Sequence, residues 1–404
     1  MLTNKWWNYK RFQGDNVKVL LVSLRHLLLK ELSLSLIKLG HSSQTLLIGE
    51  TALDRNLVEQ RYTEAIRNFE PDFVLTVNHL GFDQEGVVTD LLTHFKVPFA
   101  SWYVDSPHLI IHHYFRNKSP YLSLFLWDRD YIDIIKRQGF KNVEYLPLGV
   151  DESLFKPLNG KQNALTHLSS DISFAGNSMV FKVSSVLRRN NIQGLLLENL
   201  DKVAIAFEQS TKLIVRDIIE EQFPELVKDL NRLSSAQIYG YEAAVTWQAT
   251  CLYRLKLVKR LQPFSHLIIG DPGWERILGQ GFRLHRELNY YQELNSFYNM
   301  SRINFNATSR QMKNGINQRI FDVPASGGVV LTDHTLQLET LMEPGRDLLT
   351  YHNEDEIPDL IDKTLKDPQF HKKIAESGKK RVLNEHTYSH RLENLIKVMK
   401  RNYA

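Results

Sequence analysis

The feature that most constrains the fold is an alternation of short apolar runs with helical segments. Runs of strand length that are apolar throughout, rather than at every second residue, are typical of parallel strands covered by helices on both faces. The first half of the chain therefore reads as a Rossmann-like unit. Its predicted strands are residues 17–23 (VKVLLVS), 44–49, 72–78, 98–105, 121–128 and 142–149.

The second half repeats this alternation. Predicted strands lie at residues 171–177, 266–271, 303–308 and 328–333. A long, mostly helical region covers about 183–261, and amphipathic helices are predicted at 356–365, 368–385 and 388–401. We therefore predict an α/β chain of two Rossmann-like domains that face a central cleft and bind ligands at the carboxyl ends of their strands.

The length of 404 residues also indicates two domains, because single cores rarely grow beyond about 250–300 residues. Between 149 and 167, Pro, Gly and Asn replace the periodic apolar residues, which is typical of a linker. We predict an acceptor domain over 1–158 and a donor domain over 159–385. The helix in 386–404 is expected to cross back to the first domain.

The amino-acid composition limits which partners the protein is expected to bind and in which cellular compartment it is expected to lie. Fifty basic and 46 acidic residues give a net charge of +4, which does not indicate a nucleic-acid-binding protein. The one cysteine, Cys251, excludes an intrachain disulfide and a multi-cysteine zinc site, and it fits a reducing cytoplasm. No segment has the ~20 apolar residues of a transmembrane helix. The Trp6–Trp7 pair could make peripheral membrane contact, but packing on its own domain is the preferred interpretation.

The most informative stretch is NGINQRIFDVPASGGVVLTD, residues 314–333, which combines a helical pattern with a proline, a Gly-Gly pair and several polar residues. We expect its helix to begin near Gly315–Asn317, at the ligand-binding edge of the sheet. Unpaired N–H groups at a helix start bind anions. The residues expected to hold a phosphate there are Arg310, Lys313, Asn314, Gly315, Asn317 and Arg319.

Two features further along this stretch complete the predicted nucleotide site. Asp322, about one and a half turns into the helix, could accept hydrogen bonds from ribose hydroxyls. Gly327 and Gly328 would end the helix and let backbone pass close to the ligand. The alternative is a purely structural helix with an Arg319–Asp322 ion pair and Gly327 as its C-cap.

Three further positions follow predicted strands. The turn at Gly176 and Asn177 could place backbone N–H groups on a diphosphate, or it could be an ordinary strand–helix turn. Asp105 could orient an acceptor hydroxyl or act as a base, or it could be a turn or cap residue. Asp128 and Asp130 mimic an Asp-x-Asp metal motif, but a helix N-cap is the preferred interpretation.

Several segments together resemble the CgeB-like spore-maturation glycosyltransferases, which have the GT-B fold of the group 1 glycosyl transferases. They are 303–334 (INFNATSRQMKNGINQRIFDVPASGGVVLTDH), 341–357 (LMEPGRDLLTYHNEDEI), FAGN (174–177), LIIGDPGW (267–274), YLPLGVDESLFKP (145–157) and SWYVDSP (101–107). Together they span most of the chain, with 182–261 matching least. The order of the segments supports the resemblance more than any single motif does.

The resemblance also assigns residues. It implies that Asp322 takes the place of the acidic residue that holds the donor ribose, where the wider retaining group usually has Glu. Asn317 and Arg319 would border the donor pocket, and Gly327 and Gly328 match the family's glycine turn. The upstream acid of the group's Glu-x7-Glu pair would fall at Asn314 or at the following glycine, so the sugar-facing half of that motif is missing.

The sequence thus predicts a glycosyltransferase that moves a sugar from a nucleotide-diphosphate sugar to a protein, a surface glycan or a small molecule. Retention of configuration is favoured, and neither a cofactor nor a metal is expected. Three alternatives stay open: a sugar-nucleotide epimerase of similar fold, a catalytically inactive structural module, and a regulatory module that binds nucleotide without turnover.

Overall fold

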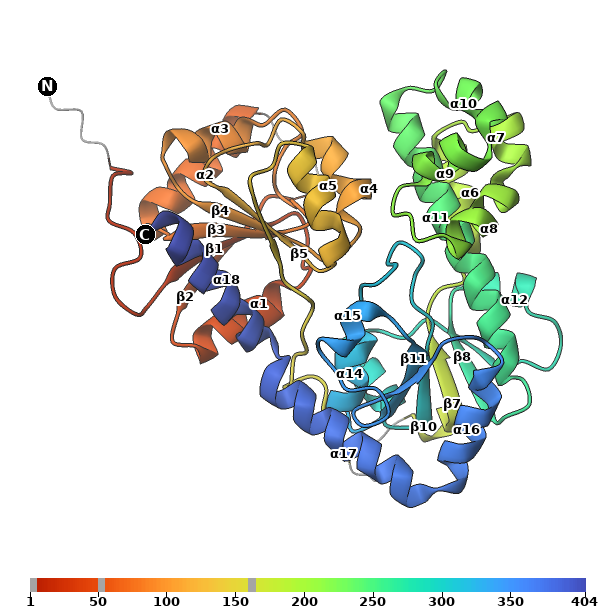
Figure 1. Ribbon diagram of the computed structural model, residues 1–404. Coiled ribbons are helices and arrows are strands. Elements are labelled where there is room, and N and C mark those ends of the chain that lie inside the picture. The colour runs from red at the N-terminus through yellow and green to blue at the C-terminus, as the bar shows by residue number, and fades with distance from the viewer. Residues whose placement is uncertain (1–5, 50–54, 159–164) are drawn as a thin grey trace, which may run out of the picture. The chain divides into compact units, whose positions relative to one another are not determined.

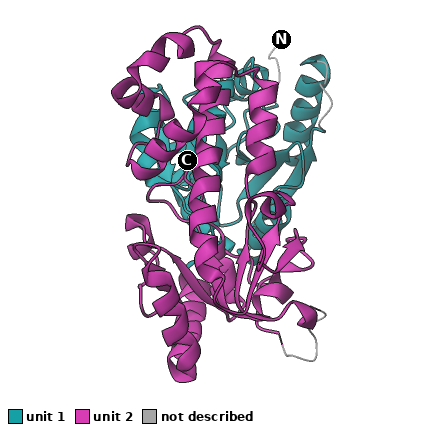
Figure 2. Cartoon of the chain, turned by 90° about the vertical axis from the view of Figure 1, so that its right-hand side faces the viewer, with its two compact units in different colours: residues 1–149, 386–404 teal, residues 150–385 magenta. Residues whose placement is uncertain are grey.

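The computed structural model describes residues 6–49, 55–158 and 165–404, which form two compact units (Figures 1 and 2). Unit 1 contains the described residues up to Gly149 together with His386–Ala404, and unit 2 contains those from Val150 to Glu385. The division follows Gly149, whereas the sequence placed it after residue 158.

Unit 1 is built on a parallel six-stranded sheet with the strand order β2-β1-β3-β4-β5-β6. All six strands predicted for the first half are present. Their bounds are β1 Lys18–Ser23, β2 Ser42–Leu47, β3 Phe73–Val77, β4 Phe99–Tyr103, β5 Leu122–Leu126 and β6 Asn142–Tyr145. The helices between them are α1 Leu29–Lys38, α2 Arg55–Phe69, α3 Val87–His94, α4 Pro107–Ile111 and α5 Ile132–Arg137.

The order in which the chain visits the strands decides which face of this sheet each helix covers. The chain passes from β1 to β2 in one direction and from β2 to β6 in the other, so right-handed crossovers place α1 on the face opposite α2 to α5. Helix α18 (Tyr388–Tyr403) packs against α1 (Figure 1). It is held by Arg391, whose Nε donates to the Leu148 carbonyl at 2.9 Å, and by Tyr403, whose hydroxyl lies 3.0 Å from Ser123 Oγ.

Unit 2 contains a second parallel sheet, with the order β12-β11-β10-β7-β8-β9. Its strands are β7 Ser170–Ala175, β8 His266–Gly270, β9 Leu284–Arg286, β10 Ser301–Asn306, β11 Val329–Asp333 and β12 Leu349–Tyr351. The sequence predicted four of them; β9 and β12 have three residues each and carry too little pattern. The remaining helices are α12 Gly273–Ile277, α13 Leu294–Tyr298, α14 Arg319–Ala325, α15 Leu336–Glu339, α16 Glu356–Lys366 and α17 Pro368–Glu385.

A helical insert separates β7 from β8, drawn in green in Figure 1. It consists of α6 Val180–Arg189, α7 Leu195–Glu198, α8 Leu200–Gln209, α9 Val215–Gln222, α10 Pro224–Leu230 and α11 Ser235–Val258. The insert has its own apolar core, which includes Val203, Phe207 and Ile218. The core of the sheet, around Phe174 and Phe305, is a separate cluster. The segment that matched the family least is thus a subdomain of its own.

Two features of the chain bear on membranes. Among the described residues, no helix is long and apolar enough to cross one. The Trp6 ring lies 5.0 Å from Phe95, and the Trp7 ring lies 5.5 Å from His94 and 5.1 Å from Phe95. The tryptophan pair therefore packs on unit 1, as the preferred interpretation held.

Candidate nucleotide site

In the sheet of unit 2, successive strands are added outward from β7 on one side and outward from β10 on the other. The strand order therefore reverses at one point, between β7 and β10. Numbered within the unit, the sheet reads 3-2-1-4-5-6, which is the order of dinucleotide-binding folds. Ligands of open α/β sheets bind outside the carboxyl ends of the strands at this point. The turn after Ala175 and the loop after Asn306 both emerge there, because Ser173 and Phe174 pair with Asn304 and Phe305.

One buried amide, that of Asn306, joins two side chains at this edge. Asn306 Oδ1 accepts a hydrogen bond from Asn317 Nδ2 at 2.8 Å and another from Arg319 Nη1 at 3.2 Å. A Cβ atom placed on Gly176 would lie only 3.4 Å from Arg319 Nη2. The structure thus groups Gly176, Asn317 and the half-buried Arg319, three of the residues for which the sequence suggested a role in nucleotide binding. Asn306 was missed, although a polar residue at the end of an apolar strand was a signal for it.

A second arginine, Arg254 on α11, fixes the two loops and was also missed. Its Nη1 donates to the Asn177 carbonyl at 2.7 Å, and its Nε donates to the Ala307 carbonyl at 3.3 Å. Burial, followed by the charge of Arg319, lowers the pKa of Arg254 to about 9. Two guanidinium groups thus lie at this edge, and the carboxylates of Asp333 and Asp271 act on Arg254 in the opposite sense to Arg319. In the sequence, Arg254 lay in a featureless helical run.

The helix expected near Gly315–Asn317 begins later, at Arg319, and is only seven residues long. Gln318 is its N-cap, and Asn317 Oδ1 accepts from the backbone N–H of Arg319 at 3.2 Å. Gly315 is buried and, like Asn314, lies in the loop before the helix. The first turn of α14 therefore starts with the charged Arg319 and not with the predicted Gly315. Positive charge at this helix start comes from the Arg319 side chain in addition to the backbone N–H groups.

Asp322 lies in the first turn of α14 and is 1% exposed. Its Oδ2 accepts from the Tyr290 hydroxyl at 3.1 Å, and its Oδ1 accepts from Gln318 Nε2 at 2.9 Å. Both oxygens thus have partners within unit 2. A ribose at this position would have to replace Tyr290 or Gln318 as a donor.

Arg310 and Lys313 contact the helical insert. Arg310 Nη2 donates to the Glu208 carbonyl at 3.3 Å, and the guanidinium lies 4.7 Å from the ring centre of Tyr253. Lys313 Nζ donates to the Phe207 carbonyl and lies 3.9 Å from the centre of the Phe207 ring. Burial, followed by the charge of Arg310, lowers the pKa of Lys313 to about 7. These contacts tie the loop before α14 to α8, which sequence spacing could not show.

The two glycines after α14 have protein neighbours. Gly327 has a φ of 84°, and a Cβ atom there would lie 3.2 Å from Pro157. A Cβ atom on Gly328 would lie 2.8 Å from Asn304 Nδ2 and 3.1 Å from Val323. The expectation that these glycines clear space for a ligand is therefore corrected: Gly327 ends the helix, and Gly328 allows it to pack on β10.

A hollow of about 390 Å³ lies at the carboxyl ends of β8 and β9. Trp274 forms one wall, and its Nε1 donates to the Gly176 carbonyl at 2.7 Å, so the hollow adjoins the Gly176 turn. Asp271 and Arg286 also line it. Its size and position suit one planar ring system next to the predicted diphosphate position.

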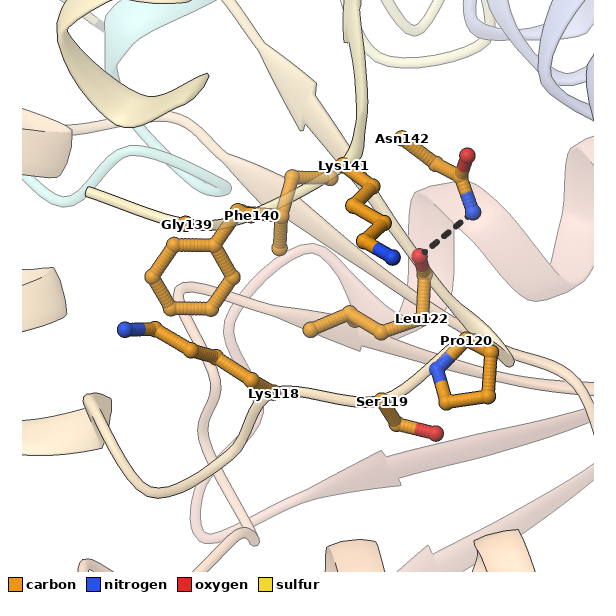
Figure 3. A pocket seen from close by; sticks show the side chains of 9 residues that line it. Lys118, Ser119, Pro120, Leu122, Gly139, Phe140, Lys141 and Asn142 are labelled. Carbon is orange, nitrogen blue, oxygen red and sulfur yellow. Dashed lines mark hydrogen bonds between the residues drawn. The ribbon is translucent and has the colours of Figure 1, made fainter. Parts of the chain in front are cut away.

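Another hollow, of about 290 Å³, lies in unit 1 between Lys118, Phe140 and Asn142 (Figure 3). Asn142 Nδ2 donates to the Leu122 carbonyl at 3.2 Å. Leu122 and Asn142 are the first residues of β5 and β6. The hollow is therefore at the amino ends of the strands, opposite the edge at which such sheets bind ligands.

In unit 1 the strand order reverses between β1 and β3. A residue that follows β3, Asn78, is hydrogen-bonded to Asp105. Asn78 Nδ2 donates to the exposed carboxylate of Asp105 at 2.9 Å, and Asn78 Oδ1 accepts from the backbone N–H of Val104 at 2.9 Å. Asn78 and His79 have φ angles of 52° and 58°, an uncommon conformation for residues other than glycine. Such strain concentrates at functional positions. The sequence placed Asp105 but missed Asn78.

His79 is fully buried beside these residues. Its Nδ1 lies 2.8 Å from the Tyr103 hydroxyl, and its ring stacks on Tyr114 at 4.8 Å. Burial lowers the pKa of His79 to about 3, so the imidazole is neutral. Its Nε2 has no hydrogen-bond partner among the described residues.

Two other sequence expectations are settled by local contacts. Asp128 caps the short helix that follows it, because its side chain accepts from the backbone N–H of Asp130 at 3.0 Å. Cys251 is buried on α11, and burial raises its pKa to about 11. Within the described residues no group of three or more His, Cys, Asp or Glu side chains could hold a metal ion.

Comparison with solved structures defines the class: this is the GT-B fold of glycosyltransferases. Sucrose-phosphate synthase from Thermosynechococcus elongatus superposes with a TM-score of 0.56 at 11% identity, over 96% of this chain and 99% of that one. A glycosyltransferase from Rickettsia africae ESF-5 gives 0.54 at 12%, over 96% and 99%. Anabaena HepE in complex with UDP-glucose gives 0.55 at 9%, over 96% and 100%. Identities this low establish the fold alone.

The sequence comparison is more specific for one part of the chain. Residues 252–397 match the glycosyl transferase-like family model. This segment runs from α11 into α18 and includes the loop and helix that carry Asn317, Arg319 and Asp322. None of the curated proteins matches the chain.

Proposed function

We propose that this protein is a glycosyltransferase that moves a sugar, of the hexose type, from a nucleotide-diphosphate sugar to an acceptor hydroxyl. The observation that carries the proposal is the placing of Arg319 against the Gly176 turn at the topological switch point of unit 2. A guanidinium next to backbone N–H groups at this point suits a diphosphate. The family match of residues 252–397 supports the same conclusion.

The chemistry requires positive charge where the leaving group develops negative charge. The bond between the sugar C1 and the diphosphate oxygen breaks, and a bond forms between C1 and the acceptor oxygen. In this proposal the side chains of Arg319 and Asn317 and the backbone of Gly176 and Asn177 stabilise the departing diphosphate. Arg310 carries further positive charge on the loop that leads to α14, whereas Lys313 has a lowered pKa and packs on Phe207 of the insert.

The other parts of the donor have proposed positions as well. The nucleobase would enter the hollow beside Trp274, and the ribose would bind near Asp322, in place of the Tyr290 hydroxyl. UDP is the first nucleotide to test, because HepE and an α-glucosyltransferase of the same fold were crystallised with it.

On unit 1, Asp105 is the proposed residue for the acceptor. Its carboxylate is exposed and oriented by Asn78, so it could accept the proton of the attacking hydroxyl. A protein, a surface glycan and a small molecule all present such a hydroxyl.

The finer features of the proposal rest on the resemblance and on charge. Membership of the CgeB-like group and retention of configuration follow from the donor-domain motif. Metal independence is supported by Arg319, which can supply the charge that a divalent cation provides in other glycosyltransferases. The single buried cysteine is in keeping with a cytoplasmic location.

One observation favours a second candidate, a module that binds nucleotide without turnover. Both Asp322 oxygens are hydrogen-bonded within unit 2. The position of the upstream acid in the Glu-x7-Glu pair holds Asn314 or the glycine after it, and neither is acidic. Such a module would bind a nucleotide but would neither hydrolyse nor transfer the sugar of its donor.

The test measures the melting temperature of the purified protein with UDP, GDP, dTDP and ADP. A nucleotide that binds at 100 times its Kd stabilises the fold by about 2.7 kcal/mol. We expect one of the four to do so, and Arg319→Ala to abolish the shift. Arg346→Ala, a change of an exposed arginine paired with Glu343, is the matched control and should keep it.

Failure of all four nucleotides at several millimolar, or an Arg319→Ala variant that binds as the wild type does, would refute the donor site. Donor hydrolysis then separates the two candidates. Release of free sugar from the bound donor supports the enzyme, and binding without release supports the module.

A further inference from the structure

Helix α1 in unit 1 exposes a stripe of large apolar and cationic side chains. Lys30, Leu34, Ile37 and Lys38 follow one another at helical spacing and therefore share one face of the helix. Leu34 is 45% exposed and Ile37 is 61% exposed, which is unusual for two large apolar residues one turn apart.

The fold of unit 1 does not account for this stripe. The opposite face of α1 carries Leu29, Leu32 and Leu36, which are 5%, 1% and 0% exposed and face the protein interior. Helix α1 packs against α18 and β2 (Figure 1). In the described part of unit 1, Leu34 and Ile37 are thus the apolar side chains of α1 that remain exposed.

The exposed charges on α1 and its flanking residues have one sign. From Leu24 to His41 the exposed charged side chains are Arg25, Lys30 and Lys38, and Glu31, the acid of this segment, is 1% exposed. A groove of about 480 Å³ between α1 and β2 adds Arg61, whose guanidinium donates to the Leu47 and Ile48 carbonyls. The stripe is thus an apolar centre surrounded by cations.

We propose that this face of α1 docks on an anionic membrane surface. Leu34 and Ile37 would enter the boundary between headgroups and acyl chains, and Arg25, Lys30 and Lys38 would lie among anionic headgroups. A second copy of the chain fits the same face poorly, because a two-fold contact would set its cations against themselves. This inference is independent of the proposed transfer reaction.

The docking site also replaces the tryptophan pair as the point of membrane contact. Trp6 and Trp7 are packed against His94 and Phe95, and Arg67 lies 4.8 Å from the Trp6 ring. Their rings are committed to unit 1, whereas the side chains of Leu34 and Ile37 are available.

The experiment measures sedimentation of the full chain with vesicles of phosphatidylcholine alone and of phosphatidylcholine mixed with phosphatidylglycerol. We expect binding to the mixed vesicles that weakens as salt is added. Each cation at an anionic surface contributes roughly fivefold to partitioning. Arg25→Gln with Lys30→Gln should therefore weaken binding about 25-fold, and Leu34→Gln with Ile37→Gln by at least about tenfold.

The matched control is Leu195→Gln with Leu197→Gln on α7 of the insert, where the leucines are 47% and 44% exposed. This variant should bind as the wild type does. The proposal is overturned if the mixed vesicles do not bind the protein, if neither α1 variant weakens binding, or if the α7 variant weakens it equally.

Melting temperature and gel filtration complete the test. The two α1 variants change different side chains, so a folding defect in one leaves the other as a valid measurement. A change of oligomeric state in the Leu34 and Ile37 variant without vesicles would show that the face binds a second copy and would also overturn the proposal.

Discussion

The buried ammonium of Lys313 predicts how the stability of unit 2 changes with pH. Lys313 is 9% exposed, and burial lowers its pKa from an ordinary 10.5 to about 7. Between these two values the unfolded chain keeps a proton that the folded chain has lost. The free energy of unfolding therefore rises with pH across this window. The informative change is Lys313→Met, which keeps the length of the side chain and removes its charge.

The size of the effect follows from the two pKa values. Each pKa unit corresponds to about 1.4 kcal/mol, so the cost of holding Lys313 in place is about 5 kcal/mol near pH 6. Near pH 9 this cost falls to about 2 kcal/mol, because folded Lys313 is neutral there and removing the proton becomes less unfavourable as the pH approaches 10.5. The stability of Lys313→Met relative to the wild type should therefore decline by about 3 kcal/mol between these conditions.

Urea unfolding at the two pH values measures this difference, and an unchanged urea dependence confirms that the same transition is followed. Lys373→Met changes an exposed lysine on α17 of the same unit and should show no such pH effect. If the curves of the Lys313→Met variant and the wild type run parallel from about pH 6 to pH 9, the ammonium is not desolvated, and the described contact with Phe207 is wrong.

Two further substitutions test the site residues. Asp322→Asn leaves one acceptor oxygen for two donors, Tyr290 and Gln318, so we expect a loss of about 1–3 kcal/mol in unfolding free energy and weaker nucleotide binding; unchanged values in both assays would contradict the placement of this carboxylate. Asn78→Ala places alanine, which tolerates the left-handed conformation less well than asparagine, at φ 52°, and it removes the hydrogen bond to Asp105. We expect it to lower the free energy of unfolding by about 1–3 kcal/mol. Asn78→Gly loses the same hydrogen bonds but tolerates the positive φ, so it should be less destabilised than Asn78→Ala; equal losses in the two variants would show that the backbone at this position is not strained.

The secondary structure was largely predictable because it depends on local patterns. Several strands appear in the sequence as apolar runs, as in Phe73–Val77 and Val329–Asp333, whereas the edge strand Ser42–Leu47 is mostly polar. The three-residue strands β9 and β12 were missed, since a run that short cannot be told from a loop. The start of α14 was placed too early, because Gly315 and Asn317 look like helix-start residues and the loop continues to Gln318.

The candidate site was predictable only in part. Gly176 and Arg319 could each be proposed as ligand-binding residues in advance, because both follow predicted parallel strands, but their proximity depends on the strand order that the structure shows. Arg254 and Asn306 could not, because their roles depend on contacts with Asn177, Ala307 and Arg319 that are distant in sequence.

The sequence by itself determined the class of architecture: apolar strands alternating with helices can be buried only in parallel sheets with helices on both faces. It also determined which loops reach the ligand-binding edge, because parallel strands all end there. Tertiary structure alone decided which side chains on those loops face one another. Arg310 and Lys313 turn to the helical insert, Asp322 turns to Tyr290, and Arg319 reaches the Gly176 turn, because partners far along the chain neutralise or solvate each charge when it leaves water.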